Sequence, residues 1–190
     1  KAEVSEGWTK LVRGRLPNTA EWSHQYANAG NVAATADALV KCPLGVLWFG
    51  EPGPDKAVNR HEGAAAPLVV GGRCFLQGEL LTGREGKHRL MAFDAYNGQL
   101  LWEREVPGAK RVAMHVECSN LAATEDSLFV ATGRQCLRLD ALTGETRATY
   151  EAPAGLDGSA RNWGYVAVVD GLLFGSATPG SQSSDAVFAV

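Results

Sequence analysis

The sequence predicts an all-β protein, a partial β-propeller built of four-stranded antiparallel blades. The main observation is an internal repeat, because the stretch around Asp94 and Gly98 returns around Asp140 and Gly144, 46 residues later. The second is that each repeat holds short apolar runs separated by turn residues, which is typical of strands. Units of four short strands recurring every ~45–50 residues indicate a radial propeller. A β-sandwich is the structural alternative, and it accounts for the strands but not for the repeat.

Composition limits the classes of protein that need to be considered. The chain has 190 residues, 45% of them hydrophobic, with 22 glycines and a formal net charge of −3. This suits a turn-rich globular protein and not a disordered one. The charge argues against a nucleic-acid partner, since such a binder needs a basic face. No apolar run approaches the ~20 residues of a membrane span, so we expect none.

The four cysteines, Cys42, Cys74, Cys118 and Cys136, show no CxxC spacing. Zinc, thioredoxin-like and c-type haem sites are therefore disfavoured. Two disulfides in any of three connectivities are one possibility. We favour free buried thiols, because Cys74 and Cys136 lie inside apolar strand-like runs.

The N-terminal region divides into an arm, residues 1–17, and a first unit, residues 18–50. A helical turn is considered in the arm around Trp8. Trp22 and Tyr26 are expected to anchor an ordered loop that pairs with a strand outside this sequence. Further on, Trp48 parallels Trp102, which makes it the final-strand tryptophan of this unit. The opening residues lack the apolar core of a signal peptide, so the chain is either cytosolic or has lost its targeting segment.

Three more units follow, at about 64–107, 116–153 and 163–190. In the second, Gly71-Gly72 forms a hairpin turn, and residues 79–87 form a longer connection. The expected strands of the three units are 66–70, 73–78, 88–93 and 99–106; 116–123, 127–132, 135–139 and 145–150; and 165–169, 172–177 and 186–190. The last of these is an inner strand with no charge to protect its edge. We therefore expect the propeller to continue beyond the chain end, its remaining blades supplied by the same or another chain.

The repeat resembles that of the PQQ-type (quinoprotein) β-propellers, which reads roughly A-x-D-x-x-T-G-x-x-x-W. Residues 92–102 read AFDAYNGQLLW, and residues 139–144 read LDALTG and match the centre of the motif. Ala148 stands where the second repeat would carry tryptophan. The resemblance covers about residues 22–190 and is especially close to PQQ-like repeat proteins of multidomain bacterial chains.

In this interpretation the repeat residues stabilise the fold, by closing turns and by packing between blades. The Asp, and the Asn or Thr before Gly, close the hairpin by bonding to the backbone. The tryptophan covers the junction between adjacent blades. We therefore expect structural roles for the motif residues Trp48, Asp94, Gly98, Trp102, Asp140 and Gly144.

The resemblance implies one of two functions. Some members are dehydrogenases that hold PQQ and Ca²⁺ in the central funnel of an eight-bladed ring. Others are scaffolds that bind proteins through loops and blade edges, and both kinds imply a periplasmic or otherwise extracytoplasmic location. The adjacent cysteines that many of the dehydrogenases carry are absent here, and the chain supplies about two and a half blades.

Candidate site residues lie in the loops that enter each first strand, because those loops face the funnel in a propeller. His61 and His115 stand fourteen residues before Phe75 and Phe129, so they could lie close together near the funnel mouth and bind a metal or relay a proton. Glu117 and Asn120 offer oxygen ligands for Ca²⁺. The arginines could attract an anionic ligand such as a quinone carboxylate, and each of these groups could instead cap a loop or face solvent. The full set is Arg60, His61, Arg111, His115, Glu117, Asn120, Arg161, Asn162 and Trp163.

The sequence thus favours a binding or scaffold module for a protein or a small-molecule ligand. The alternative is part of a quinoprotein dehydrogenase that oxidises an alcohol or sugar with PQQ and calcium. The motifs of other enzyme classes, G-x-S-x-G, the P-loop and H-E-x-x-H, do not occur.

Overall fold

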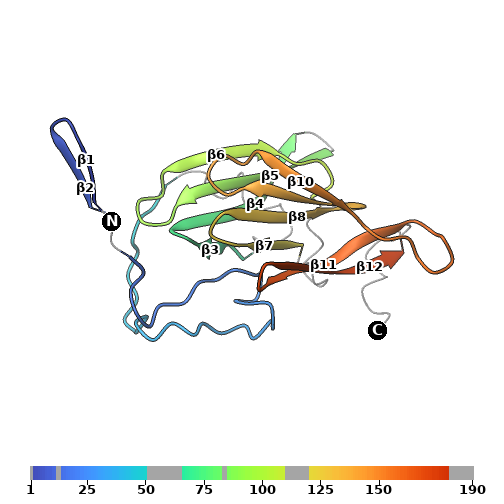
Figure 1. Ribbon diagram of the computed structural model, residues 1–190, viewed down its shortest axis with the longest axis horizontal. Helices are drawn as coiled ribbons and strands as arrows, with labels where there is room; N and C mark the ends of the chain where they lie inside the picture. The colour runs from blue at the N-terminus through green and yellow to red at the C-terminus, as the bar shows by residue number, and fades with distance from the viewer. Residues whose placement is uncertain (1, 12–13, 51–65, 83–84, 110–119, 180–190) are drawn as a thin grey trace.

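The computed structural model describes residues 2–11, 14–50, 66–82, 85–109 and 120–179. Within these ranges the chain is all-β and contains no helix, as predicted (Figure 1). The described strands form two four-stranded sheets and two two-stranded sheets. No described helix has the length and apolar character needed to cross a membrane.

The first four-stranded sheet holds its strands in chain order, each antiparallel to the next. Gly71 and Gly72, both with positive φ, form the tight turn between its first two strands. The expected connection over residues 79–87 is wrong, because the second and third strands pair as far as Thr82 and Glu85. The strands are β3 (Leu68–Val70), β4 (Arg73–Thr82), β5 (Glu85–Asp94) and β6 (Leu100–Glu105).

The second four-stranded sheet repeats this meander, in the order β7-β8-β9-β10. Both sheets have a register shift in the hairpin between strands three and four, so that Trp102 pairs with Ala92 and Ala148 pairs with Arg138. The register therefore places Ala148 at the position of Trp102. The strands are β7 (Leu121–Ala123), β8 (Ser127–Thr132), β9 (Gln135–Asp140) and β10 (Thr146–Glu151).

The last of the predicted units is described as a hairpin of β11 (Arg161–Val169) and β12 (Leu172–Pro179). Asp170 and Gly171 both have positive φ, as the tight turn between twisted strands requires. β11 begins four residues earlier than expected, so Arg161, Asn162 and Trp163 lie in a strand and not in an entering loop. The strand expected at residues 186–190 lies outside the described residues.

The arm at the N-terminus is a hairpin of β1 (Ala2–Ser5) and β2 (Trp8–Leu11) that projects from the body (Figure 1). The helical turn considered around Trp8 is therefore wrong. Val4 pairs with Thr9, and Glu3 pairs with Lys10. Because side chains alternate along a strand, Val4 and Leu11 share one face, while Glu3 and Lys10 form an ion pair on the other.

Residues 18–50 form isolated bridges and not a four-stranded sheet. Trp22 exchanges two backbone hydrogen bonds with Val69 of β3, at 2.9 and 2.8 Å. His24 forms a bridge with Ala122 of β7. The strand expected around Trp22 therefore finds its partners inside this chain, against our expectation of an external one.

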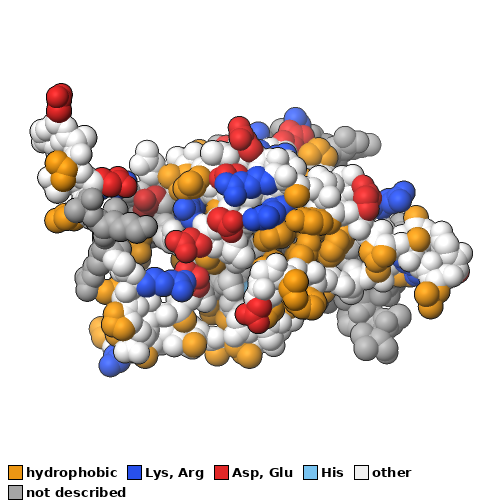
Figure 2. All heavy atoms as spheres, in the orientation of Figure 1, with side chains coloured by type: hydrophobic (Ala, Val, Ile, Leu, Met, Phe, Trp, Pro, Cys, Tyr) orange, Lys and Arg blue, Asp and Glu red, His pale blue; other side chains and the backbone are white. Residues whose placement is uncertain are grey.

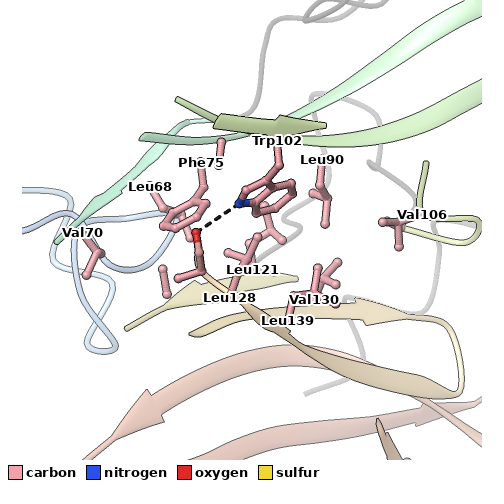
Figure 3. Close-up of a cluster of buried hydrophobic side chains, with 14 residues drawn as sticks. Leu68, Val70, Phe75, Leu90, Trp102, Val106, Leu121, Leu128, Val130 and Leu139 are labelled. Carbon is pink, nitrogen blue, oxygen red and sulfur yellow. Dashed lines mark hydrogen bonds between the residues drawn. The ribbon is translucent and has the colours of Figure 1, made fainter. Parts of the chain in front are cut away.

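The main core lies between the two four-stranded sheets (Figure 3). Phe75, Leu90 and Trp102 extend from the first sheet toward Leu128 and Leu139 of the second. A smaller cluster, which includes Ala122, Phe129, Cys136 and Val166, joins the second sheet to β11. The strands β7 and β8 bury apolar side chains on both of their faces, whereas the outer strand β10 is mostly exposed.

Candidate functional site

Two tryptophans join consecutive units in the same way. The indole N–H of Trp48 donates to the carbonyl of Ala95 (3.0 Å), and that of Trp102 donates to Ala141 (3.1 Å). Each indole lies over a repeat glycine, since a Cβ built on Gly98 or Gly144 would fall within 3 Å of it. The glycines are therefore needed both for their positive φ and for the space above them.

The repeat aspartates hold the turns beneath these indoles. Oδ1 of Asp94 accepts the amides of Tyr96 and Asn97, and Oδ1 of Asp140 accepts those of Leu142 and Thr143. The Leu142 amide is the main reason that the pKa of Asp140 lies below its usual range, with Arg147 adding to the shift. These contacts give both aspartates a role in closing the turn.

The junction after the second sheet is built differently, because Ala148 lacks an indole. Trp163 approaches it from the following unit: its backbone N–H donates to Gly133 (2.8 Å), and its indole N–H donates to Tyr150 (3.0 Å). Its ring packs on the cluster around Phe129 and lies close to Gly175. This residue, which we considered for a funnel site, thus packs across the junction between two units.

A phenylalanine on the second strand of each unit marks the face toward the unit that follows. Phe75 and Phe129 pack against the next unit and are 1% and 7% exposed. Phe174 occupies the same place in the register, opposite Ala167, and is 50% exposed. The outward face of β11–β12 therefore resembles the faces that pack between units. No described unit covers it.

His24 lies where the inner strands of the three units meet. Its side chain is 3% exposed, and burial lowers its pKa. Nε2 accepts the backbone N–H of Val168 in β11 (3.1 Å), while Nδ1 contacts the hydroxyl of Ser23 (2.8 Å). The neighbouring Ser23 carbonyl accepts the amide of Ala123 (2.9 Å). The segment from Trp22 to His24 therefore ties β3, β7 and β11 together.

Five of the sequence-predicted site residues lie outside the described residues: Arg60, His61, Arg111, His115 and Glu117. The predicted sharing of a site by the two histidines consequently stays a prediction. Asn120 is buried just before β7, and its side-chain amide nitrogen has no hydrogen-bond partner among the described residues. Arg161 pairs with Asp157 (3.3 Å), and the carbonyl of Asn162 accepts the hydroxyl of Thr178 (3.3 Å).

The described residues do not assemble a cofactor site. No group of three or more His, Cys, Asp or Glu side chains in this part of the chain is placed to hold a metal ion. Arg161 and Trp163 have protein partners of their own, which leaves the neutral side-chain amides of Asn120 and Asn162. The described residues alone therefore do not form a PQQ and Ca²⁺ site.

Exposed apolar side chains gather outside the junctions. Val4, Trp8 and Leu11 of the hairpin β1–β2 are 79–81% exposed. The chain from Leu39 to Phe49 also exposes several apolar side chains. Figure 2 shows apolar surface on the projecting hairpin and along the lower edge of the body. Neither the hairpin nor His24 was expected from the sequence, because the hairpin follows no repeat and His24 lies in a loop without a period.

Comparison with solved structures identifies the type of fold. No protein-family profile matches the sequence, and no curated protein matches it either. A solved structure of quinohemoprotein alcohol dehydrogenase ADHIIG from Pseudomonas putida HK5 is similar to 85% of this chain, with a TM-score of 0.54 and 16% identity. BamB from Moraxella catarrhalis is similar over 59% of this chain and 43% of its own, with a TM-score of 0.35 and 15% identity. The chain spans about a quarter of the dehydrogenase, 25% of its length, and the likeness shows that its fold is that of a partial β-propeller.

Proposed function

We propose that the chain is a propeller scaffold that binds a protein partner through the hairpin β1–β2. The observation that carries the proposal is the exposure of Val4, Trp8 and Leu11 on an element that projects from the body (Figures 1 and 2). An isolated two-stranded hairpin is marginally stable in water. One that carries apolar side chains therefore gains stability when a partner covers them.

The hairpin has the chemistry of a docking element. Val4 and Leu11 lie on one face, and the Glu3–Lys10 pair on the other keeps that side hydrated. Trp8, on the polar face, offers a large rigid surface and an indole N–H, a combination enriched at interfaces. The partner that fits is a protein with an apolar groove or an open strand edge. An extracytoplasmic location belongs to the same proposal and rests on the resemblance of the repeat.

The test places a photo-crosslinking amino acid at position 8 of the intact protein in its source cells. We expect a discrete protein adduct at position 8, and none when the same probe replaces Leu142, an exposed apolar residue of the β9–β10 turn. Equal labelling at both positions, or none at position 8, would contradict the proposal. Titration with PQQ and Ca²⁺, followed by absorbance, tests the rival dehydrogenase function, and saturable binding would favour it.

A further inference from the structure

The sequence holds a single asparagine that is followed by a glycine, at Asn97 and Gly98 in the turn between β5 and β6. This dipeptide is chemically labile. When the backbone nitrogen of the glycine attacks the side-chain carbonyl carbon of the asparagine, a cyclic succinimide forms and ammonia leaves. Water then opens the ring to aspartate or isoaspartate. Glycine favours the attack because it has no side chain to obstruct it, and Asn97 is exposed to the water that the reaction needs.

The folded turn works against this reaction. The attacking nitrogen, that of Gly98, donates its hydrogen to the carbonyl of Asp94 (2.9 Å). The nitrogen must lose that hydrogen before it can attack, and the hydrogen bond makes the loss less favourable. The side chain of Asn97 is held as well, because its Oδ1 accepts the amide of Gln99 (2.8 Å). Both reacting groups of the dipeptide are therefore engaged within the turn.

The indole of Trp48 adds a steric restraint. A Cβ built on Gly98 would lie 2.5 Å from Cε3 of Trp48, so the ring lies directly over the glycine. The ring is fixed by its bond to Ala95 and by stacking on Phe93, with ring centroids 6.5 Å apart. Closing the succinimide requires the peptide between Asn97 and Gly98 to rotate, and this rotation moves Gly98 against the indole. The docked indole thus restricts the motion that the reaction needs.

We propose that Asn97 is a site of spontaneous deamidation that is protected while Trp48 is docked and reacts when this junction opens. The modification is irreversible, so it records the loss of contact between the segment around Trp48 and the first four-stranded sheet. It needs no enzyme, because water is the only co-reactant. It concerns a different surface from the hairpin β1–β2, and it does not depend on the proposed function.

Conversion also weakens the turn. Isoaspartate carries the backbone through its own side chain and lengthens it by a methylene group, so the amide of Gly98 no longer lies opposite the carbonyl of Asp94. Either product adds a negative charge near Asp94, whose carboxylate already accepts the amides of Tyr96 and Asn97, and like charges repel. The surface on which Trp48 docks is therefore disturbed, and a junction that has reacted opens more readily.

The second repeat supplies a natural control. The β9–β10 turn carries Thr143 in the place of Asn97, and the Thr143 hydroxyl accepts the amide of Glu145 (3.2 Å). The amide of Gly144 donates to the carbonyl of Asp140 (2.8 Å), beneath an indole of its own. The same turn is thus built without a side chain that can deamidate. Asn97→Thr should preserve the turn and abolish the reaction.

The experiment incubates the intact protein in mildly alkaline buffer and follows the peptide that contains Asn97 by chromatography and mass spectrometry. We expect slow conversion in the folded, unaltered protein and conversion several times faster when the same protein is unfolded in urea. Folded Trp48→Ala should also react several times faster than the folded, unaltered protein. Equal rates in the folded and unfolded chain, or equal rates with and without the indole, would overturn the proposal.

Trp163→Ala separates the local effect from a general loss of stability. This variant removes an indole from the junction beyond the second four-stranded sheet, and Asn97 should react in it as slowly as in the unaltered protein. Equal acceleration in Trp163→Ala and Trp48→Ala would show that global unfolding controls the reaction, and it would refute the role of Trp48.

The consequence of the modification is measured on the converted protein, which its additional negative charge separates from the unconverted form. Backbone amides of the β5–β6 turn and of the chain around Trp48 should exchange hydrogen faster in the converted protein. Asn97→Thr, incubated in the same way, should show no such change with time. Unchanged exchange in the converted protein would contradict the predicted opening of the junction.

Discussion

The indole of Trp163 donates its N–H to the carbonyl of Tyr150 from the unit that follows, at the junction where Ala148 has replaced the repeat tryptophan. The two earlier junctions are filled from the preceding unit, by Trp48 and Trp102. Trp163 thus contacts this junction from the opposite side, from the unit that follows.

This relationship predicts the effect of removing Trp163. Trp163→Ala should lower the free energy of unfolding by about 2 kcal/mol, because a partly buried indole leaves an apolar cluster. Urea unfolding followed by circular dichroism measures the change. The matched control is Trp8→Ala on the exposed hairpin, expected within about 0.5 kcal/mol of the unaltered protein. Equal effects of the two substitutions would contradict the assigned role.

Trp102→Ala should have the larger effect, about 3–5 kcal/mol, because this indole is buried between two sheets and leaves a cavity. Trp102→Phe should lose less, since it keeps most of the apolar volume and loses the bond to Ala141. The same urea measurement applies. A loss below about 1 kcal/mol for Trp102→Ala would contradict this packing.

Gly144 and Gly133 provide a matched pair, since both have positive φ, at 74° and 77°. Ala at Gly133 should cost about 1–2 kcal/mol for the left-handed backbone, because nothing lies within 4 Å of its Cβ. Ala at Gly144 should cost more, because its Cβ would lie 2.7 Å from Cε3 of Trp102. Comparing the unfolding free energies isolates the packing contribution, and equal costs would show that the indole can move away.

Stability should fall as pH falls below the ordinary histidine pKa of about 6.5. The neutral ring of His24 accepts the Val168 amide, and a protonated ring cannot. Because burial lowers the folded-state pKa, the unfolded chain binds the proton first. The contribution is therefore complete above about pH 6.5 and is lost progressively down to the folded-state pKa. His24→Gln, measured over the same pH range, should lack this component, and an unchanged pH profile would contradict the assignment.

Thiol labelling should distinguish two cysteines of the native protein. Burial raises the pKa of Cys136 to about 12, and the residue is buried, so a thiol reagent should reach it only on unfolding. Cys42 is exposed and should react at once, which makes it an internal control. Peptide mapping after labelling, with and without urea, measures both. Fast labelling of native Cys136 would show that the second sheet opens locally.

The sequence predicted the parts of the fold that repeat. Asp94 and Asp140, with their glycines, located both four-stranded sheets, because a turn that needs a particular residue leaves a local signal. The preference for buried free thiols is confirmed for Cys136, while Cys118 lies outside the described residues. The early start of β11 was not predicted, because Arg161 and Asn162 are polar and their strand character comes from pairing with Pro179 and Thr178.

The candidate site was less predictable than the fold. Trp163 was assigned to a funnel loop because nothing in the repeat indicates that its indole packs back onto the preceding unit. His24 was not selected, since its importance arises from one contact with a distant strand. Such contacts depend on how units are placed in space, and spacing along the chain does not encode them locally.

The bond between His24 and Val168 joins residues 144 positions apart. At synthesis rates of about 5–20 residues per second, His24 is added to the chain roughly 7–30 seconds before Val168. During that interval the Trp22–His24 segment can bind β3, and later β7, but not β11. The segment from Trp22 to His24 should consequently be held in stages, and its last attachment reports that the unit containing β11 and β12 has been synthesised and docked.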